Sequence, residues 1–265
     1  MSHLTLSEVI KALGGGRQVT AFFLVLARVT PLFLLAPLFS SKMLPMRVRG
    51  ILAVGLAMGL TPLALHGQQV PSQPFALAGL LVEELLVGLA FSFAVGAVFA
   101  AVDAAGHLID TQSGFSFGAT VDPINGNQGG IMTTVYGLVG TAVFIAIGGD
   151  AWTVRGLART FALVPLARGP RLSSLVAGIE QAFASIFVSA LEVAAPALLA
   201  LLITDAAFGM VSRVVPQLNI FGVGFPVKVG VALLIVGAAL PFLSNWMVGQ
   251  LSSSVGTALG TLHVI

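Results

Sequence analysis

The sequence predicts an all-α protein of the integral-membrane type, on two observations. Hydrophobic residues make up 57% of the 265 residues and charged residues only 8%, about a third of the charged share of an ordinary soluble domain. Apolar runs of about 20 residues, the length of a membrane-spanning helix, recur at 18–41, 50–66, 75–102, 129–149, 182–204 and 229–251. We therefore expect one domain over residues 1–265 with about six hydrophobic helical segments.

The composition also excludes several classes of function. The formal net charge of +2 is too small and too dispersed for a nucleic-acid surface. The chain has no cysteine, which excludes disulfides and thiol catalysis. The four histidines lie far apart in the sequence, so no pair has the helical spacing of a metal site. We therefore expect no metal, no cofactor and no nucleic-acid partner.

The N-terminal part holds two predicted elements. A short apolar period over residues 1–17 predicts an interfacial helix. The run at 18–41 follows, and it contains Arg28, Pro31 and Pro37. The prolines are expected to bend the helix and free backbone carbonyls. A buried arginine satisfied by other groups is the favoured interpretation of Arg28, and a transport role is the alternative.

The helix predicted at 75–102 carries a ridge of small residues. They recur every four positions: Gly88, Ser92, Gly96 and Ala100. Such a ridge lets another backbone approach closely, so we predict close helix packing along it. Glu84 lies one turn earlier, beside Glu83, and a carboxylate in an apolar run is costly unless it is paired, hydrated or protonated. A structural partner is favoured over ion coupling, which stays open.

The link over 106–128 is the most irregular part of the chain. Its glycines permit backbone conformations that other residues resist, whereas Phe115, Phe117 and Val121 are too apolar for a freely solvated loop. We therefore expect this link to be packed into something. An ordinary tight connection between helices is the alternative to a functional role.

The same link contains the G-x-S-x-G pattern of serine hydrolases around Ser116. That pattern requires a strand before it and a helix after it, and no strand is expected here. His107 and Asp110 are near in sequence, but we expect them to bond local backbone. The sequence therefore does not favour a nucleophile at Ser116.

The charged loops contradict six simple membrane crossings. Basic residues fall in two loops that six crossings would place on opposite sides: Lys42, Arg47 and Arg49 in the first, and Arg155, Arg159, Arg168 and Arg171 in the link at 150–174. The positive-inside rule places such residues on one side. Either the link at 103–128 re-enters without crossing, or these helices do not span a membrane in the ordinary way.

The C-terminal stretch "LLITDAAFGMVSRVVPQLNIFGVGFPVKVGV" resembles the signature of the FliR family, the flagellar type III export-gate proteins related to the SctT family of injectisomes. The matching residues are Pro196, Asp205, Gly209, Arg213, Pro216, Gln217, Leu218, Asn219, Phe221, Gly224, Phe225, Pro226, Val227 and Lys228. The stretches "RVTPLFLLAPLFSS", "MLPMRVRGILAVGLAMGLTP" and "AAGHLIDTQSGFSFGATVDP" are similar to the family's first helix, second helix and central link. The resemblance covers nearly the whole chain.

The resemblance implies a fold, partners and a place. FliR-like proteins assemble with FliP and FliQ into a closed helical cone of tilted hairpins, and FlhB wraps its cytoplasmic end. The N-terminal half would be FliP-like and the C-terminal half FliQ-like. The implied function is that of a non-enzymatic, structural and gating component of the flagellar export channel, through which unfolded export substrates pass. The implied location is the bacterial inner membrane at the flagellar basal body, with much of the assembly toward the periplasm.

The resemblance also assigns residues to roles. The link at 106–122 would be the plug of the channel, with Gly114, Phe115, Phe117, Gly118 and Val121 as gate residues. The stretch at 216–228 would be a turn buried between subunits. Residues predicted to contact other subunits are Arg28, Glu83, Glu84, Arg213, Pro216, Gln217, Asn219, Phe225, Pro226 and Lys228.

Two other functions stay open from the residues alone. An ion-coupled secondary transporter would use Glu83, Glu84, Glu192 and Asp205, and it should show repeat symmetry with interrupted helices in corresponding halves. An intramembrane hydrolase would place a base within hydrogen-bond reach of Ser116. The sequence shows neither pattern.

Overall fold

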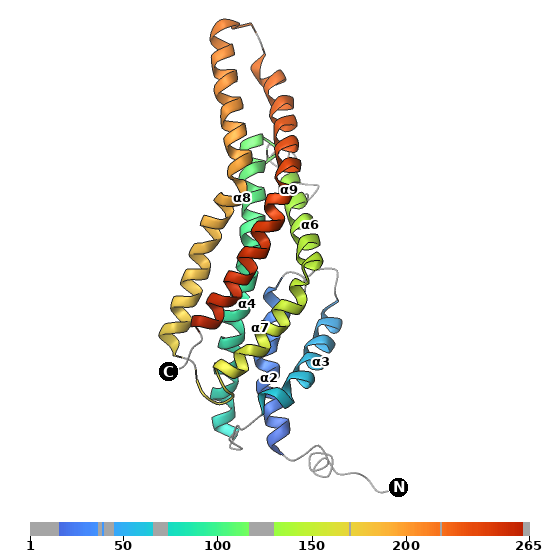
Figure 1. The fold of residues 1–265 in the computed structure, drawn as a ribbon, viewed down its shortest axis with the longest axis vertical. Helices are drawn as coiled ribbons and strands as arrows, with labels where there is room; N and C mark the ends of the chain where they lie inside the picture. Colours follow the sequence, from blue (N-terminus) through green and yellow to red (C-terminus); the bar gives the residue numbers. More distant parts are fainter. Residues whose placement is uncertain are drawn as a thin grey trace. The chain divides into compact units, whose positions relative to one another are not determined.

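The computed structural model describes residues 16–36, 39, 45–65, 74–116, 130–169, 171–217 and 219–261. These residues form seven α-helices and no strand (Figure 1). In chain order the helices are α2 (Gly16–Leu35), α3 (Met46–Ala64), α4 (Pro74–Ser113), α6 (Ile131–Ala146), α7 (Gly149–Leu163), α8 (Leu172–Val214) and α9 (Ile220–Thr261). The predicted all-α class is confirmed.

Within the described residues, five helices are long and apolar enough to cross a membrane: α2, α3, α4, α8 and α9. Helices α6 and α7 pass the same test only together, as a pair broken at a short turn. Each of the six predicted hydrophobic segments falls on one of the five helices or on α6. The interfacial helix predicted over residues 1–17 lies outside the described residues, except that Gly16 and Arg17 begin α2.

Two links predicted from hydropathy prove to be partly helical. Helix α4 continues through the start of the link predicted at 103–128 and ends at Ser113. Helix α7 occupies most of the link predicted at 150–174. Some polar residues on these stretches, such as Asp103 and Arg155, are exposed, whereas others, such as Asp110 and Thr160, are buried. The fall in hydropathy therefore does not mark the end of a helix.

The break between α6 and α7 lies at Gly148. This glycine has φ +68°, a left-handed conformation that glycine adopts without a steric cost. Its carbonyl accepts a hydrogen bond from the backbone N–H of Trp152 at 3.1 Å and so begins α7. The apolar run predicted at 129–149 therefore ends at this turn.

The two C-terminal helices are longer than their predicted apolar segments. Helices α8 and α9 have 43 and 42 residues; α8 ends at Val214 and α9 begins at Ile220. The Asn219 side chain accepts a hydrogen bond from the N–H of Gly222 at 3.0 Å, which is an N-cap for α9. The turn predicted over 216–228 is therefore corrected, because residues from Ile220 onward are helical and Pro226 lies inside α9.

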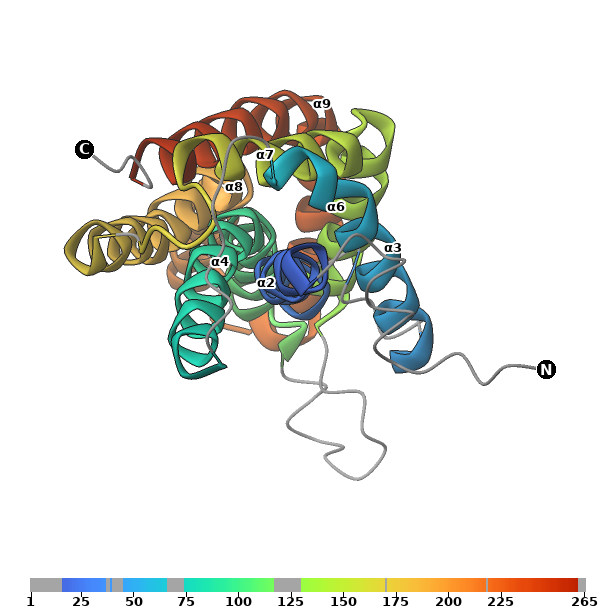
Figure 2. The same ribbon diagram turned by 90° about the horizontal axis from the view of Figure 1, so that it is seen from below.

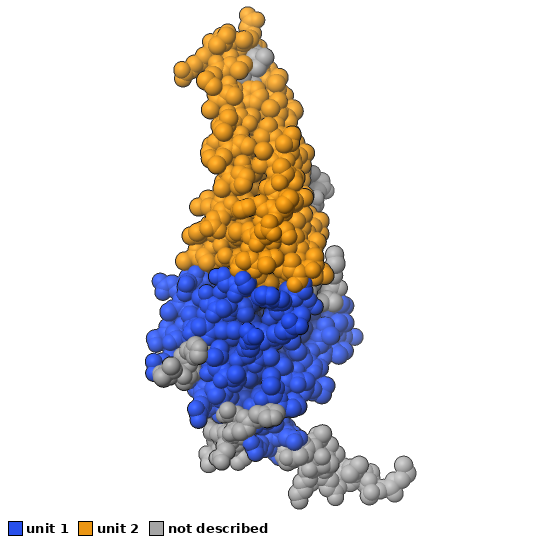
Figure 3. Space-filling view, in the orientation of Figure 1, with its two compact units in different colours: residues 1–96, 148–182, 252–265 blue, residues 97–147, 183–251 orange. Residues whose placement is uncertain are grey.

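The chain divides into two compact units (Figure 3). Unit 1 comprises residues 1–96, 148–182 and 252–265, and unit 2 comprises 97–147 and 183–251. Helices α2, α3 and α7 belong to unit 1 and α6 belongs to unit 2, whereas α4, α8 and α9 contribute residues to both.

In unit 1, α3 packs against α2 and also touches α7 (Figure 2). The buried core side chains include Leu24 and Leu32 of α2, Phe91 of α4 and Leu157 of α7. In unit 2, the rings of Phe99 on α4 and Phe144 on α6 form an edge-to-face pair with centroids 5.1 Å apart, a favourable aromatic geometry.

Candidate functional sites

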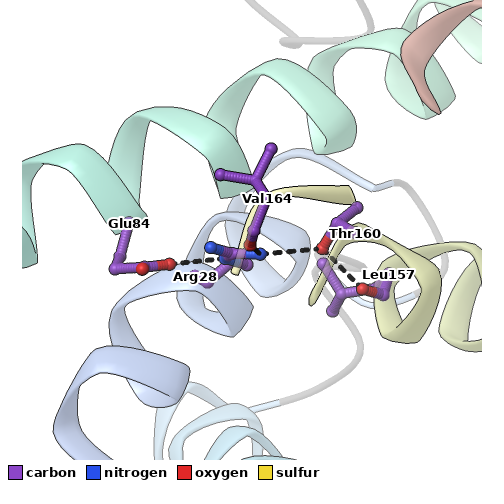
Figure 4. Close-up of polar contacts among 5 residues, drawn as sticks. All are labelled: Arg28, Glu84, Leu157, Thr160 and Val164. Atoms are coloured by element: carbon purple, nitrogen blue, oxygen red, sulfur yellow. Dashed lines mark hydrogen bonds and ion pairs between the residues drawn. The ribbon is translucent and has the colours of Figure 1, made fainter. Parts of the chain in front are cut away.

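The first site is a buried arginine network in unit 1. Arg28 on α2 is completely buried. Its Nε donates to Oε2 of Glu84 on α4 at 2.5 Å, and its Nη1 donates to the carbonyl of Val164 at 2.9 Å and to Oγ1 of Thr160 at 3.4 Å. The guanidinium also lies 4.4 Å from the ring centre of Phe161. Figure 4 shows the polar contacts, which tie α2 to both α4 and the end of α7.

The network is almost fully satisfied. Thr160 accepts from Arg28 and donates to the carbonyl of Leu157 at 2.6 Å. Among the described residues, Arg28 Nη2 finds no hydrogen-bond partner. A charge removed from water is tolerated when it is paired and hydrogen-bonded, so Arg28 and Glu84 satisfy each other within one chain. The structure thus assigns both residues an intrachain contact.

The ridge of small residues on α4 faces α2. A Cβ at Gly88 would collide with the carbonyl of Arg28, and a Cβ at Gly96 would lie 3.2 Å from the carbonyl of Leu35. Ser92 between them is buried and its hydroxyl has no partner among the described residues, whereas Ala100 is exposed. The close approach at Gly88 is what lets Arg28 reach Glu84.

Four glycines in two G-x-x-x-G patterns do not pack in this way. A Cβ at Gly55, Gly59, Gly256 or Gly260 would meet nothing within 4 Å. Glu83, half-buried on α4, lies against Gly169, where a Cβ would be 2.9 Å from its carboxylate oxygen.

The second site is a helix cap in unit 2. Asp110 on α4 is buried, and its carboxylate accepts hydrogen bonds from the backbone N–H of Met132 at 2.8 Å and of Thr133 at 2.9 Å. The Thr133 hydroxyl donates to the same carboxylate at 2.7 Å. These groups belong to the first turn of α6, whose N–H groups have no partner inside the helix. The backbone that Asp110 bonds is therefore distant in sequence, which corrects the expectation of a local bond.

His107 does not face this cap. Its side chain is exposed and lies 3.6 Å from the carboxylate of Asp103, one helical turn earlier. The contacts of the His107 and Asp110 side chains are thus with Asp103 and with the first turn of α6.

The third site is a cluster around Asp205 in unit 2. The Asp205 carboxylate on α8 forms an ion pair with Lys228 on α9 and accepts a hydrogen bond from Gln112 Nε2 on α4 at 3.0 Å. Close by in the chain, a Cβ at Gly114 would lie 3.2 Å from the ring of Phe225. Gly114 has φ +89°, so glycine is favoured there on conformational grounds too. This Asp205 cluster links α4, α8 and α9.

The remaining predicted site residues are distributed as follows. Phe115 is half-buried, and Arg213, Pro216, Gln217, Asn219, Phe225 and Pro226 are exposed. Phe117, Gly118 and Val121 lie outside the described residues. Three contacts were not predicted from the sequence: the Asn219 cap, the Asp110 cap and the ion pair of Lys228 with Asp205.

Three of the four carboxylates proposed for ion coupling have structural partners. Glu84 pairs with Arg28 and Asp205 with Lys228, and Glu192 accepts a hydrogen bond from Trp246 Nε1 at 3.1 Å. In the described part of the chain, no group of three or more His, Asp or Glu side chains could hold a metal ion.

These features define a membrane-type helical protein in which buried polar groups join helices within the chain. The chain belongs to a family described as bacterial export proteins, family 1, whose profile matches residues 19–254. The resemblance to the FliR family that the sequence indicates is thereby confirmed.

Three curated relatives extend this match. The chain is 31% identical to the flagellar biosynthetic protein FliR of Escherichia coli (strain K12) over 223 residues, which cover 84% of this chain and 85% of that protein. It is 30% identical to the surface presentation of antigens protein SpaR of Salmonella typhimurium, covering 79% of each. It is 28% identical to FliR of Bacillus subtilis (strain 168), covering 82% of this chain and 84% of that protein.

Proposed function

We propose that the chain is a structural and gating subunit of a type III protein export channel in the bacterial inner membrane, assembled with FliP-, FliQ- and FlhB-type subunits. Its membership of an export family and its similarity to proteins named FliR and SpaR support this. In this proposal the N-terminal half is FliP-like, the C-terminal half is FliQ-like, and the chain performs no catalysis.

The observation that carries the proposal is the exposed apolar surface of α8. Large apolar side chains are exposed on this helix throughout its part in unit 2, from Phe183 to Val214. At about 1.5 Å per residue this stretch is roughly 47 Å long, whereas the hydrocarbon core of a membrane is about 30 Å thick. Part of this surface therefore lies beyond lipid.

Apolar surface beyond lipid must be covered by protein, because a soluble surface rarely exposes so large a patch. Helix α9 has the same character, with Leu233 and Leu234 exposed near its middle. Repeated copies of similar hairpins would cover both helices, as in the cone implied by the FliR resemblance. This is the physical basis for assigning subunit partners to the chain.

The gating part of the proposal rests on the end of α4. Gly114 adopts a left-handed conformation and lies close to the ring of Phe225. The half-buried Phe115 follows it directly in the chain. An apolar constriction can close a pore by excluding water. We infer that Phe115, with Phe117 following it in the link, contributes to such a constriction in the assembled channel.

Co-purification tests the assembly. The tagged chain is expressed alone and together with FliP- and FliQ-type subunits, solubilised in detergent and analysed by size-exclusion chromatography. We expect a monodisperse complex only with both partners, since the exposed faces of α8 and α9 need them. If the chain is stable and monodisperse alone and does not co-purify with either partner, the proposal is contradicted.

A further inference from the structure

A small pocket in unit 1 carries chemistry that the proposed function does not use. It has a volume of about 280 Å³ and lies between α7 and the last turns of α9. Helix α7 lines it with Trp152, Arg155 and Arg159, and α9 lines it with Ser252, Val255, Gly256 and Leu259. Two cations, an indole, one serine and apolar side chains thus surround one cavity.

The two arginines of the pocket differ from Arg28 in being free. Both are exposed, and neither has a hydrogen-bond or ion-pair partner among the described residues. They lie one helical turn apart, so both guanidinium groups project from one face of α7. Trp152, 46% exposed, precedes Arg155 by three residues and occupies the same face.

The position of α7 against α9 is fixed by Gly156. A Cβ at this residue would lie 2.9 Å from Phe91 and 3.0 Å from Val255, so the two helices meet closely beneath the pocket. By contrast, a Cβ at Gly256 would meet nothing within 4 Å. The space above Gly256 is therefore open for a ligand.

The lining matches the parts of a phospholipid. Guanidinium groups bind phosphate oxygens through paired, charge-assisted hydrogen bonds. Tryptophan favours the boundary between apolar chains and polar headgroups. Val255 and Leu259 offer apolar contacts to the glycerol and the first acyl carbons. A partner's carboxylate would use the arginines but would leave this aromatic and apolar lining without a role.

The charge of the surrounding segment agrees with a membrane surface. Arg155 and Arg159 belong, with Arg168 and Arg171, to the cluster that the positive-inside rule places at the cytoplasmic side. Anionic lipids of that leaflet attract basic segments, and basic pockets between helices bind their headgroups. We propose that the pocket formed by Trp152, Arg155, Arg159 and the end of α9 binds the phosphate headgroup of an anionic phospholipid.

Quenching of Trp152 by brominated lipids tests the proposal. The chain has two tryptophans, so the Trp246→Phe variant leaves Trp152 as the single reporter. The protein is placed in phosphatidylcholine nanodiscs with increasing fractions of brominated phosphatidylglycerol or brominated phosphatidylcholine. We expect half-maximal quenching at a roughly tenfold lower fraction of the anionic lipid, since each arginine near a membrane surface strengthens binding severalfold. Equal quenching by the two lipids would overturn the proposal.

Matched variants separate the pocket from diffuse charge. Arg155→Gln with Arg159→Gln should abolish the preference, whereas Arg168→Gln with Arg171→Gln makes the same charge change outside the pocket and should preserve it. Gly256→Leu should also abolish it by filling the open space while all the arginines remain. Loss of the preference in the Arg168 and Arg171 variant to the same extent would contradict a built site.

Three further measurements decide the nature of the occupant. Native mass spectrometry of the unsubstituted chain should retain phosphatidylglycerol at a ratio that falls with Arg155→Gln and Arg159→Gln; equal retention contradicts the proposal. Inorganic phosphate should not reverse the quenching, because a free anion lacks the apolar contacts; reversal would make phosphate the ligand. If co-expressed partner subunits shield Trp152 from both lipids equally, a protein occupies the pocket and the proposal fails.

Discussion

The guanidinium of Arg28 and the carboxylate of Glu84 form a buried ion pair that joins α2 to α4, with Nε 2.5 Å from Oε2. Each residue alone is an expensive charge in an apolar helix, and together they satisfy each other. The pair therefore serves the fold of unit 1, and its chemistry explains why both charges are tolerated.

Removing one partner of this pair should destabilise unit 1 more than removing both. Arg28→Met or Glu84→Leu leaves a buried group without its partner, at a cost of about 3 to 5 kcal/mol. The double variant Arg28→Met with Glu84→Leu should cost less than either single change. Thermal unfolding in detergent, analysed as a double-mutant cycle, measures the coupling. Additive effects of the two changes would show that the pair does not act as one unit.

The contact between α2 and α4 at Gly88 should be intolerant of a methyl group. Gly88→Ala should destabilise by roughly 1 to 3 kcal/mol, because its Cβ meets the carbonyl of Arg28 and the helices must shift. Gly96→Ala, with a carbonyl 3.2 Å away, should have a smaller effect. Gly55→Ala is the matched control, since open space there leaves only the gain of about 1 kcal/mol in helix propensity. Equal melting temperatures for all three variants would refute the packing argument.

The Asp110 cap should contribute measurably to the stability of unit 2. Asp110→Ala leaves the buried N–H groups of Met132 and Thr133 unpaired, and each costs about 1 to 3 kcal/mol. Asp110→Asn keeps one acceptor oxygen and should lie between Asp110→Ala and the native chain. Asp103→Ala, exposed on the same helix, should change the free energy of unfolding little. If Asp110→Ala lowers the free energy of unfolding no more than Asp103→Ala does, the cap contributes nothing specific to stability.

The proposed gate should depend on the size of the apolar Phe115 and Phe117 side chains and not on the hydroxyl of Ser116. Phe115→Ala with Phe117→Ala should make the assembled channel leak ions or small solutes while the complex still forms, because an apolar constriction seals by excluding water. Ser116→Ala should leave the membrane tight. Conductance or dye uptake by cells that express the complex measures the leak. A tight membrane with normal complex yield in the double variant would remove these phenylalanines from the gate.

The sequence predicted the helices well and their connections less well. Apolar runs located the hydrophobic segments, because burial in lipid or protein requires them. Polar helical stretches such as the end of α4 escaped detection, since hydropathy does not report helix ends. The cap at Asn219 was readable, as asparagine is a preferred N-cap residue, but the prolines around it favoured a longer turn.

The sequence indicated which buried charged residues needed a partner, but not which residues would pair. Arg28 and Glu84 were each recognised as needing a partner, and the glycine ridge beside Glu84 indicated where a helix would pack. Their pairing depends on which helix fills that groove, 56 residues away in the chain. Asp110 gave no comparable signal, because a cap on the distant α6 depends on tertiary packing alone.

The most direct test of the account is whether partner subunits cover the exposed apolar face of α8. The native chain has no cysteine, so Ile203→Cys on α8 and Ile51→Cys on α3 supply single thiols at side chains that are 70% and 71% exposed. Both are labelled with N-ethylmaleimide in detergent, with and without co-expressed FliP- and FliQ-type subunits. We expect the partners to slow the labelling of residue 203 severalfold and that of residue 51 much less, since α3 has the length of a simple membrane span. Unchanged labelling of residue 203 in the presence of both partners would contradict the assembly on which the proposed function rests.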